Sequence, residues 1–349
     1  MARAAGLALL ALLVSGPCLW AQDAAAGPSA HGFLFGDVMY VAGGDAPEGF
    51  KLGQAVVHGN VLLSDRVAFF GEVSLTGRDT GYGIEIERAI LRYDFNDAFK
   101  ISAGRYHTPI SYWNTAFHHG LWLQGSVARP EAIKFGSRFI PVHFVGAMAE
   151  GRIPESPVTY AAGVGNGRAA NIARAGDAGD VNGSRALFAS AAVQPADLTG
   201  FRVGGGIYLD DVDADGGTPA DERITSAHVV WDRGGLDLVG EFIHVRHNAK
   251  GSGSGVTSTA AYLHAGVKLP GELRAFMPYV RWETMDIGEG DVVFTGVVPD
   301  YDAVLAGVRY DFSPYSALKV EYRDEKFDGA ASVGRLFIQA SFAAPITPG

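Results

Sequence analysis

The feature that most constrains this chain is a two-residue alternation of apolar and charged side chains. Residues 316–327, SALKVEYRDEKF, show it clearly, because three apolar residues alternate there with three charged ones: Leu318, Lys319, Val320, Glu321, Tyr322 and Arg323. Successive side chains of a β-strand point to opposite faces, so this pattern predicts a strand with one apolar and one charged face. The apolar face must be covered either by a second sheet, as in a soluble sandwich, or by lipid.

The number and length of such segments favour lipid. We expect about sixteen strands, each close to the ~9–11 residues that a tilted membrane-spanning strand requires. They are predicted at 32–41, 51–63, 66–77, 83–95, 98–106, 139–150, 157–166, 185–195, 200–209, 223–232, 235–245, 257–269, 273–284, 301–312, 315–326 and 333–343.

The connections between these segments alternate in length. Tight turns are predicted at Ser64-Asp65, Asn96-Asp97, 233–235, Pro270-Gly271 and Ser313-Pro314. Longer loops fall between them, at 107–138, 167–184, 210–222, 246–256 and 285–300. Lipid cannot satisfy backbone N–H and C=O groups, so a sheet in a membrane must close on itself. The sequence therefore predicts an all-β fold, a transmembrane antiparallel β-barrel with short periplasmic turns and long outer loops.

The N-terminus indicates export. Arg3 precedes an apolar run from Ala4 to Val14 and then small residues, so residues 1–21 are predicted to be a signal peptide and 22–349 the barrel. The single cysteine, Cys18, lies in this segment, and as a lipid-anchoring residue it is a poor fit after Pro17. We expect a location in the outer membrane of a Gram-negative cell, with lipid as a partner. A net charge of −10 argues against nucleic acid as a partner.

Residues 87–114 read ERAILRYDFNDAFKISAGRYHTPISYWN, a strand, a short turn and a second strand ending in Gly-Arg-aromatic, followed by a long loop. This pattern resembles the bacterial outer-membrane porin superfamily, in particular the branch named after phosphate-selective porins. The resemblance implies a sixteen-stranded barrel in which residues 107–138 fold inward and narrow the pore. It also implies a lysine-rich anion site at the constriction, whereas this loop offers only Arg129, Lys134 and Arg138.

The predicted constriction is rich in histidines and aromatic residues. Besides the three basic residues just named, its candidate pore-lining residues are His107, Tyr112, Trp113, His118, His119 and Trp122. A zinc site is disfavoured, because adjacent histidines do not readily point at one metal and no cysteine or carboxylate lies between His107 and His119. A Ser-His hydrolase using Ser111 or Ser126 is a further alternative, but no third catalytic group is evident. The aromatic residues either pack the loop against the wall or stack on sugars.

The charged face of the strands points to the lumen if the apolar face meets lipid. Basic residues outnumber carboxylates on this face, and the wall candidates are Arg88, Arg92, Arg281, Arg309, Lys319 and Arg323. A basic wall favours anions. The alternative is a mixed transverse field with weak selectivity.

Residues 211–222, DVDADGGTPADE, match the spacing of a calcium-binding loop, with Gly216 at the turn. The candidate oxygen ligands are Asp211, Asp213, Asp215 and Glu222. The flanks read as strands rather than helices, so an acidic, solvated outer loop is the alternative. Apart from this calcium ion, we expect no cofactor.

These observations predict a passive diffusion channel for small hydrophilic solutes, weakly selective for anions and without enzymatic activity. A homotrimer is the expected assembly. The alternative function is a binding or adhesion protein in which the barrel anchors functional outer loops.

Overall fold

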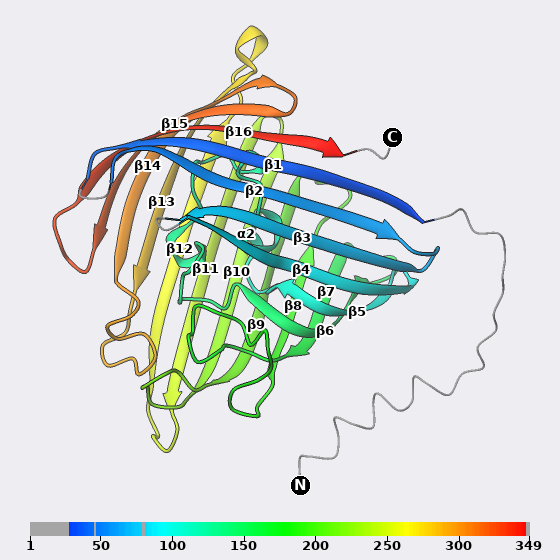
Figure 1. Ribbon diagram of the computed structural model, residues 1–349, viewed down its shortest axis with the longest axis vertical. Coiled ribbons are helices and arrows are strands. Elements are labelled where there is room, and N and C mark those ends of the chain that lie inside the picture. Colours follow the sequence, from blue (N-terminus) through cyan, green and yellow to red (C-terminus); the bar gives the residue numbers. More distant parts are fainter. Residues whose placement is uncertain (1–27, 45–46, 79–80, 347–349) are drawn as a thin grey trace.

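The computed structural model describes residues 28–44, 47–78 and 81–346, so the predicted signal peptide at 1–21 lies outside it. Sixteen antiparallel strands form one closed barrel in which each strand pairs with its neighbours in sequence (Figure 1). The strands are β1 (Ser29–Ala42), β2 (Gly49–Leu62), β3 (Val67–Arg78), β4 (Gly81–Asn96), β5 (Phe99–His107), β6 (His143–Arg152), β7 (Val158–Gly165), β8 (Ala186–Val193), β9 (Phe201–Val212), β10 (Ala220–Arg233), β11 (Leu236–Ala249), β12 (Gly255–Val267), β13 (Phe276–Asp286), β14 (Tyr301–Ser313), β15 (Ser316–Phe327) and β16 (Val333–Ile346).

Helical structure is limited to short pieces. They are α2 (Tyr112–Ala116) and the 3-10 turns η1 (Leu121–Leu123), η2 (Glu131–Ile133) and η3 (Gly271–Leu273). Among the described residues, no helix is both long and apolar enough to cross a membrane.

The two faces of the strands differ as the alternation predicts. On β15, Val320 is 41% exposed on the outside of the barrel, whereas the neighbouring Glu321 is 0% exposed. Large apolar side chains cover the outer surface on many strands, among them Phe69, Leu91, Leu263 and Val304. Charged side chains face the interior, the inverse of a water-soluble protein and the arrangement that a lipid-facing barrel requires.

The barrel closes where β1 pairs with β16, from Gly32 opposite Ile346 to Ala42 opposite Leu336. Closure leaves no unpaired strand edge, so the main-chain hydrogen bonds of the wall are satisfied around the ring. Each predicted strand segment corresponds to an observed strand, and the predicted fold class is confirmed.

Connection lengths follow the predicted asymmetry in most places. Residues 63–66, 97–98, 234–235 and 314–315 connect strands at one end, and the long segments 108–142, 166–185 and 287–300 lie at the other. The predicted loops at 210–222 and 246–256 are too long. They shrink to 213–219 and 250–254, because β9, β10 and β11 continue their alternating pattern beyond the predicted ends.

Strand β4 contains a bulge that changes which side chains face inward. Glu72 pairs with Arg88 but the next residue, Val73, pairs with Ile86, so Glu87 is an extra residue in the ladder. Both Glu87 and Arg88 therefore point to the interior, where Glu87 is buried and Arg88 lines a cavity. Bulges commonly re-aim side chains in this way next to functional sites.

Candidate functional site

The segment 108–142 leaves β5, crosses the lumen and returns to β6 (Figure 1). Its first part is docked on the far wall by the carboxylate of Glu241 on β11. Glu241 accepts hydrogen bonds from the Ser111 hydroxyl at 3.1 Å, the Tyr112 backbone N–H at 3.0 Å and the Tyr262 hydroxyl at 2.8 Å. Ser111 also caps α2, because its Oγ accepts from the Asn114 N–H. We call residues 108–142 the constriction loop.

Basic side chains of the barrel wall hold the backbone of residues 121–128. Arg309 donates to the Trp122 and Gln124 carbonyls at 2.6 and 2.9 Å. Lys319 donates to the Leu121 and Ser126 carbonyls at 2.5 and 2.9 Å. These contacts satisfy carbonyl groups that an irregular segment inside a barrel would otherwise leave unpaired.

Three further wall residues extend this anchoring. Arg281 donates to the Ala128 carbonyl at 2.8 Å, and Glu321 accepts from the Val127 N–H at 2.9 Å. Arg323 in turn donates to Glu321 at 2.8 Å. Of the predicted lumen-wall residues, Arg281, Arg309, Lys319 and Arg323 are therefore buried beneath or beside the constriction loop.

The loop's aromatic residues differ in role. Trp113 is buried and lies edge-on to Tyr262, and Trp122 packs against a small apolar cluster of the wall. The Tyr112 ring, in contrast, lies 5.2 Å from that of His228 and borders a cavity. Trp113 and Trp122 are positioned to hold the loop, whereas Tyr112 can meet a solute.

A buried chain of charges ties the outer loops to the barrel. Arg168 donates to both oxygens of Glu222 at 3.0 Å and to the carbonyls of Arg138 and Phe139 at 2.8 and 3.0 Å. His247 contacts Glu222 at 3.0 Å and Asp291 at 2.9 Å. The end of the constriction loop is thereby linked to the loops at 166–185 and 287–300.

This network engages one of the four candidate calcium ligands. Glu222 lies within β10 and faces Arg168 and His247, while Asp211 at the end of β9 pairs with Lys250 at 3.0 Å. Asp213 and Asp215 lie in the short connection 213–219. Calcium binding by this set stays a prediction that would require Glu222 to leave its partners.

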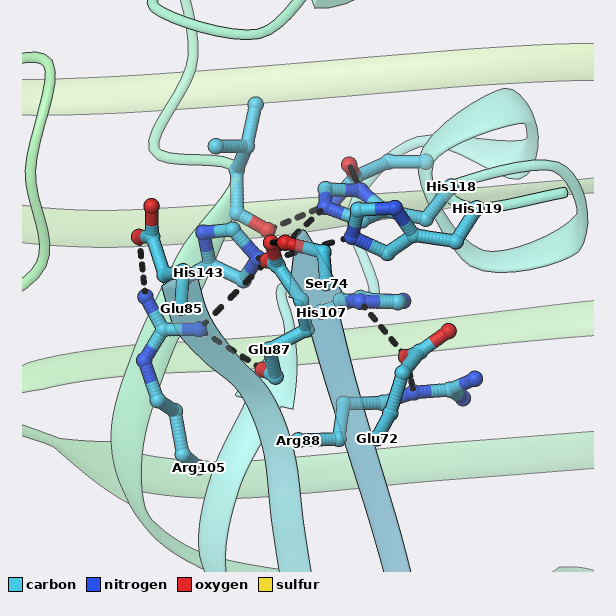
Figure 2. Close-up of polar contacts among 12 residues, drawn as sticks. Glu72, Ser74, Glu85, Glu87, Arg88, Arg105, His107, His118, His119 and His143 are labelled. Carbon is cyan, nitrogen blue, oxygen red and sulfur yellow. Dashed lines mark hydrogen bonds and ion pairs between the residues drawn. The ribbon is translucent and has the colours of Figure 1, made fainter. Parts of the chain in front are cut away.

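The three histidines predicted at the constriction lie together (Figure 2). The His107 and His118 rings stack with centroids 3.6 Å apart, and the His118 and His119 rings lie 4.7 Å apart. Two residues that the sequence reasoning did not single out join them, Glu87 from the β4 bulge and His143, which pairs with His107 across β5 and β6.

Arg129 lies beside these histidines. Its guanidinium carbon sits 3.4 Å from the centre of the Phe135 ring, and its Nη1 lies 3.4 Å from His118 Nδ1. Burial lowers the pKa of Arg129 to about 9, although the carboxylates of Glu87 and Glu72 act to raise it. Burial and the neighbouring cations hold the pKa of His118 well below its ordinary value. The other two basic loop residues are exposed, Lys134 beside Glu131 and Arg138 donating to the Val297 carbonyl at 3.0 Å.

The hydrolase alternative finds no support in the serine contacts. Ser111 Oγ donates to Glu241, and Ser126 Oγ donates to the Ala128 carbonyl and accepts from Arg281 at 2.6 Å. Within the described part of the chain, neither hydroxyl is hydrogen-bonded to a histidine, so the nucleophile–base contact of a Ser-His enzyme is missing.

Cavities remain on the side of the lumen that the constriction loop does not fill. One of 470 Å³ is bordered by β5 to β10, and a second of 420 Å³ by β2 to β7. Both share Pro109, Thr115, Glu150 and Ala161, and together they reach from the turn residue Asp97 to His107. The carboxylates that line these cavities are Asp97 and Glu150. They are outnumbered by basic side chains, which are Arg88, Arg92, Lys100, Arg152 and Arg202.

Comparisons by sequence find no matching family model and no matching curated protein. Solved structures do match. The trimer form of OmpT, an outer membrane protein of Vibrio cholerae, is 14% identical with a TM-score of 0.59, covering 91% of this chain and 100% of that chain. The outer membrane channel DcaP of Acinetobacter baumannii is 13% identical with a TM-score of 0.58, covering 92% and 98%. The outer membrane protein OpdK of Pseudomonas aeruginosa is 8% identical with a TM-score of 0.51, covering 91% and 99%. The chain shares their barrel fold.

Proposed function

We propose that the protein is an outer-membrane porin, a passive diffusion channel for small hydrophilic solutes. The observation that carries the proposal is a closed barrel, apolar outside, whose polar lumen is narrowed by the constriction loop but keeps cavities along one wall. The structural likeness to DcaP, which is described as an outer membrane channel, supports it. Export by the signal peptide at residues 1–21 and insertion into the outer membrane of a Gram-negative cell belong to the same proposal.

The channel is proposed to be weakly selective for anions. The excess of basic over acidic side chains along the cavities favours this choice, because charges lining a narrow pore act on a permeating ion over short distances. Phosphate specificity is not included. Of the loop's three basic residues, Arg129 is buried beside the histidines and Lys134 pairs with Glu131.

A homotrimer is proposed as the assembly. The support is the trimer form described for OmpT, whose barrel this chain resembles at a TM-score of 0.59. Chemical cross-linking of the protein in native membranes would test it, since a trimer gives a ladder that ends at three chains.

The experiment for the channel is conductance in a planar bilayer. Purified, folded protein should insert in discrete current steps, and a salt gradient should give a reversal potential of the sign expected for anions. Folding is checked independently by the shift in gel mobility on boiling, which a closed barrel shows. Folded protein that produces no steps would refute the channel and favour a barrel that only anchors its outer loops.

Selectivity is tested with Arg202→Glu. Arg202 contacts Tyr112 and His228 at the cavity, so its charge faces passing ions. A unit charge ~4 Å from an ion contributes about 1 kcal/mol in water, so the anion-to-cation permeability ratio should fall roughly fivefold or more. The matched control is Arg274→Glu in the exposed turn before β13, which should leave the ratio nearly unchanged.

A further inference from the structure

Five buried titratable side chains converge where the constriction loop meets the wall. Glu87 comes from β4, His107 from β5, His143 from β6, and His118 and His119 from the loop (Figure 2). One ligand atom each from Glu87, His107, His118 and His119 lies within 4.8 Å of the others. We call these four residues the His-Glu cluster.

Distances within the cluster are those of metal ligands. Glu87 Oε2 lies 3.1 Å from His119 Nε2 and 3.9 Å from His118 Nε2. In a tetrahedral zinc site with bonds of ~2.1 Å, ligand atoms are separated by about 3.4 Å. The observed separations fall on either side of that value, so small side-chain rotations would bring the atoms into ligating positions.

Among the described residues, the converging atoms make no well-directed hydrogen bond, although Glu87 Oε2 lies 3.1 Å from His119 Nε2. This holds for Nε2 of His107, His118 and His119 and for Oε2 of Glu87, all in side chains that are more than nine-tenths buried. A buried polar group without a partner destabilises a protein, because it has given up its hydrogen bonds to water. One cation bound between these atoms would satisfy all of them at once.

The contacts of the Nδ1 atoms in the loop histidines indicate which ring nitrogen can bind a metal ion. His118 Nδ1 lies 2.7 Å from Asn114 Oδ1, and Asn114 is oriented because its Nδ2 donates to the Thr108 and Val142 carbonyls. His118 Nδ1 must therefore carry the proton, which leaves the Nε2 lone pair aimed into the cluster. His119 Nδ1 lies 3.3 Å from Gln54 Oε1, a contact in which it can donate its proton and leave Nε2 free to ligate.

The carboxylate is also oriented. Ser74 Oγ donates to Glu87 Oε1 at 2.5 Å, which leaves Oε2 for the histidines, and His143 Nε2 approaches that oxygen at 3.0 Å. Second contacts of this kind to a ligand are characteristic of metal sites. The nearby Arg129 guanidinium opposes binding of a cation, while Glu72, 3.5 Å from His107 Nε2, favours it.

We propose that Glu87, His107, His118 and His119 form a site for a divalent transition-metal ion, with Zn²⁺ as the ion best matched to three imidazoles and one carboxylate. Neutral imidazole suits zinc, copper and nickel, whereas magnesium and calcium prefer oxygen ligands. The bound ion would clamp the constriction loop to β4 and β5. This inference does not depend on solute passage, because ion binding is measured without a channel assay.

The test uses the full-length folded protein, stripped with a chelator and dialysed against Zn²⁺. Elemental analysis should then give one zinc per chain, and Co²⁺ in place of zinc should give the strong visible absorption of a tetrahedral site. His119→Gln and Glu87→Gln should each weaken zinc binding by at least about tenfold, and Glu87→Gln preserves the side-chain shape if His119→Gln fails to fold. The control is His31→Gln, at an exposed histidine of β1, which should leave zinc binding unchanged.

Equal zinc content in the parent protein and the His119→Gln and Glu87→Gln variants would overturn the proposal, as would absence of zinc from the parent protein. Loss of zinc on His143→Gln with retention on a His107→Gln variant would overturn the assignment of ligands. Channel conductance that persists in zinc-free protein would leave the porin proposal standing whichever result is obtained, so the two proposals fail separately.

Discussion

The anchoring of the constriction loop by Lys319 can be tested by Lys319→Met. The ammonium group donates to the Leu121 and Ser126 carbonyls at 2.5 and 2.9 Å, and methionine fills similar space without donating. Hydrogen bonds to charged groups contribute about 1.5–3 kcal/mol each. The buried ammonium also carries a desolvation penalty that methionine lacks, so we expect a net loss of roughly half the sum of the two bonds.

A loss of about 1.5–3 kcal/mol in anchoring corresponds to a ~10–100-fold increase in the fraction of time that residues 121–128 are detached. The freed segment would widen the lumen while the barrel stays closed, because the wall is held by strand pairing and not by the loop. Single-channel recordings of the variant should therefore show frequent excursions to a higher conductance. These excursions should be rare in the parent protein.

The matched control is Lys326→Met, on the outward-facing side of the same strand. It removes a lysine from β15 without touching the loop and should leave the recordings unchanged. If Lys319→Met folds, as judged by its mobility before and after boiling, and yet shows no added excursions, then Lys319 does not restrain the loop and our reading of these contacts is wrong.

Two further predictions concern the wall and an outer loop. Val73→Arg, on the lipid face in the middle of β3, should reduce the free energy of unfolding by about 2–4 kcal/mol, and Phe69→Arg, near the start of the strand, by less. Phe70→Arg, facing a cavity, should cost clearly less than Val73→Arg; equal losses would contradict the assignment of faces. Burial acts to raise the pKa of Asp291, but hydrogen bonds from His247 and from the backbone of 293–294 hold the pKa below its ordinary 3.8. A lowered pKa means that the stabilisation is present above pH ~4 and is lost as the pH falls through the folded-state pKa. The protection of 287–300 against hydrogen exchange should accordingly fall when the pH drops below about 4, and Asp291→Asn should remove this acid-side loss; an unchanged acid-side profile in the variant would exclude Asp291 as its source.

The barrel could be predicted from the sequence because its physical cause is local. Each strand faces lipid on one side and polar groups on the other, and that contrast is written into every second residue, as in Val320 and Glu321. The predicted ends of β9 to β11 were less accurate. These strands continue their inward–outward alternation into segments whose turn-forming residues had suggested loops.

The role of Glu87 could not be predicted by strict alternation. Its neighbours contain a usable signal, however, since apolar residues occupy Ile84 and Ile86 and then Ala89 and Leu91, and the change from even to odd positions marks the bulge. The carboxylate that the sequence reasoning found missing among the histidines comes from this bulge. The position of His143 beside His107 could not be predicted for a different reason. It depends on the register of β5 and β6, which a long loop connects.

The lumen residues illustrate another limit. Alternation indicates that Arg88 and Arg309 both face inward, but it does not indicate against which wall the constriction loop will lean. The structure places Arg309 under the loop and Arg88 at a cavity. That distinction depends on contacts between segments almost two hundred positions apart, which no local pattern records.

Residues 111–128 of the loop are held mainly by β11 to β15, while His118 and His119 contact Glu87 of β4; the cavities follow β2 to β10, so the passage is eccentric. One consequence concerns how such a protein can change over generations. Cavity-side residues outside the His-Glu cluster, such as Arg202, can be replaced to suit a new solute with little effect on the loop's attachment, and residues such as Lys319 can vary without altering what the solute meets. Most residues that would contact a solute therefore lie on a different part of the barrel wall from most residues that hold the constriction loop. Single substitutions can then change solute preference without detaching the loop.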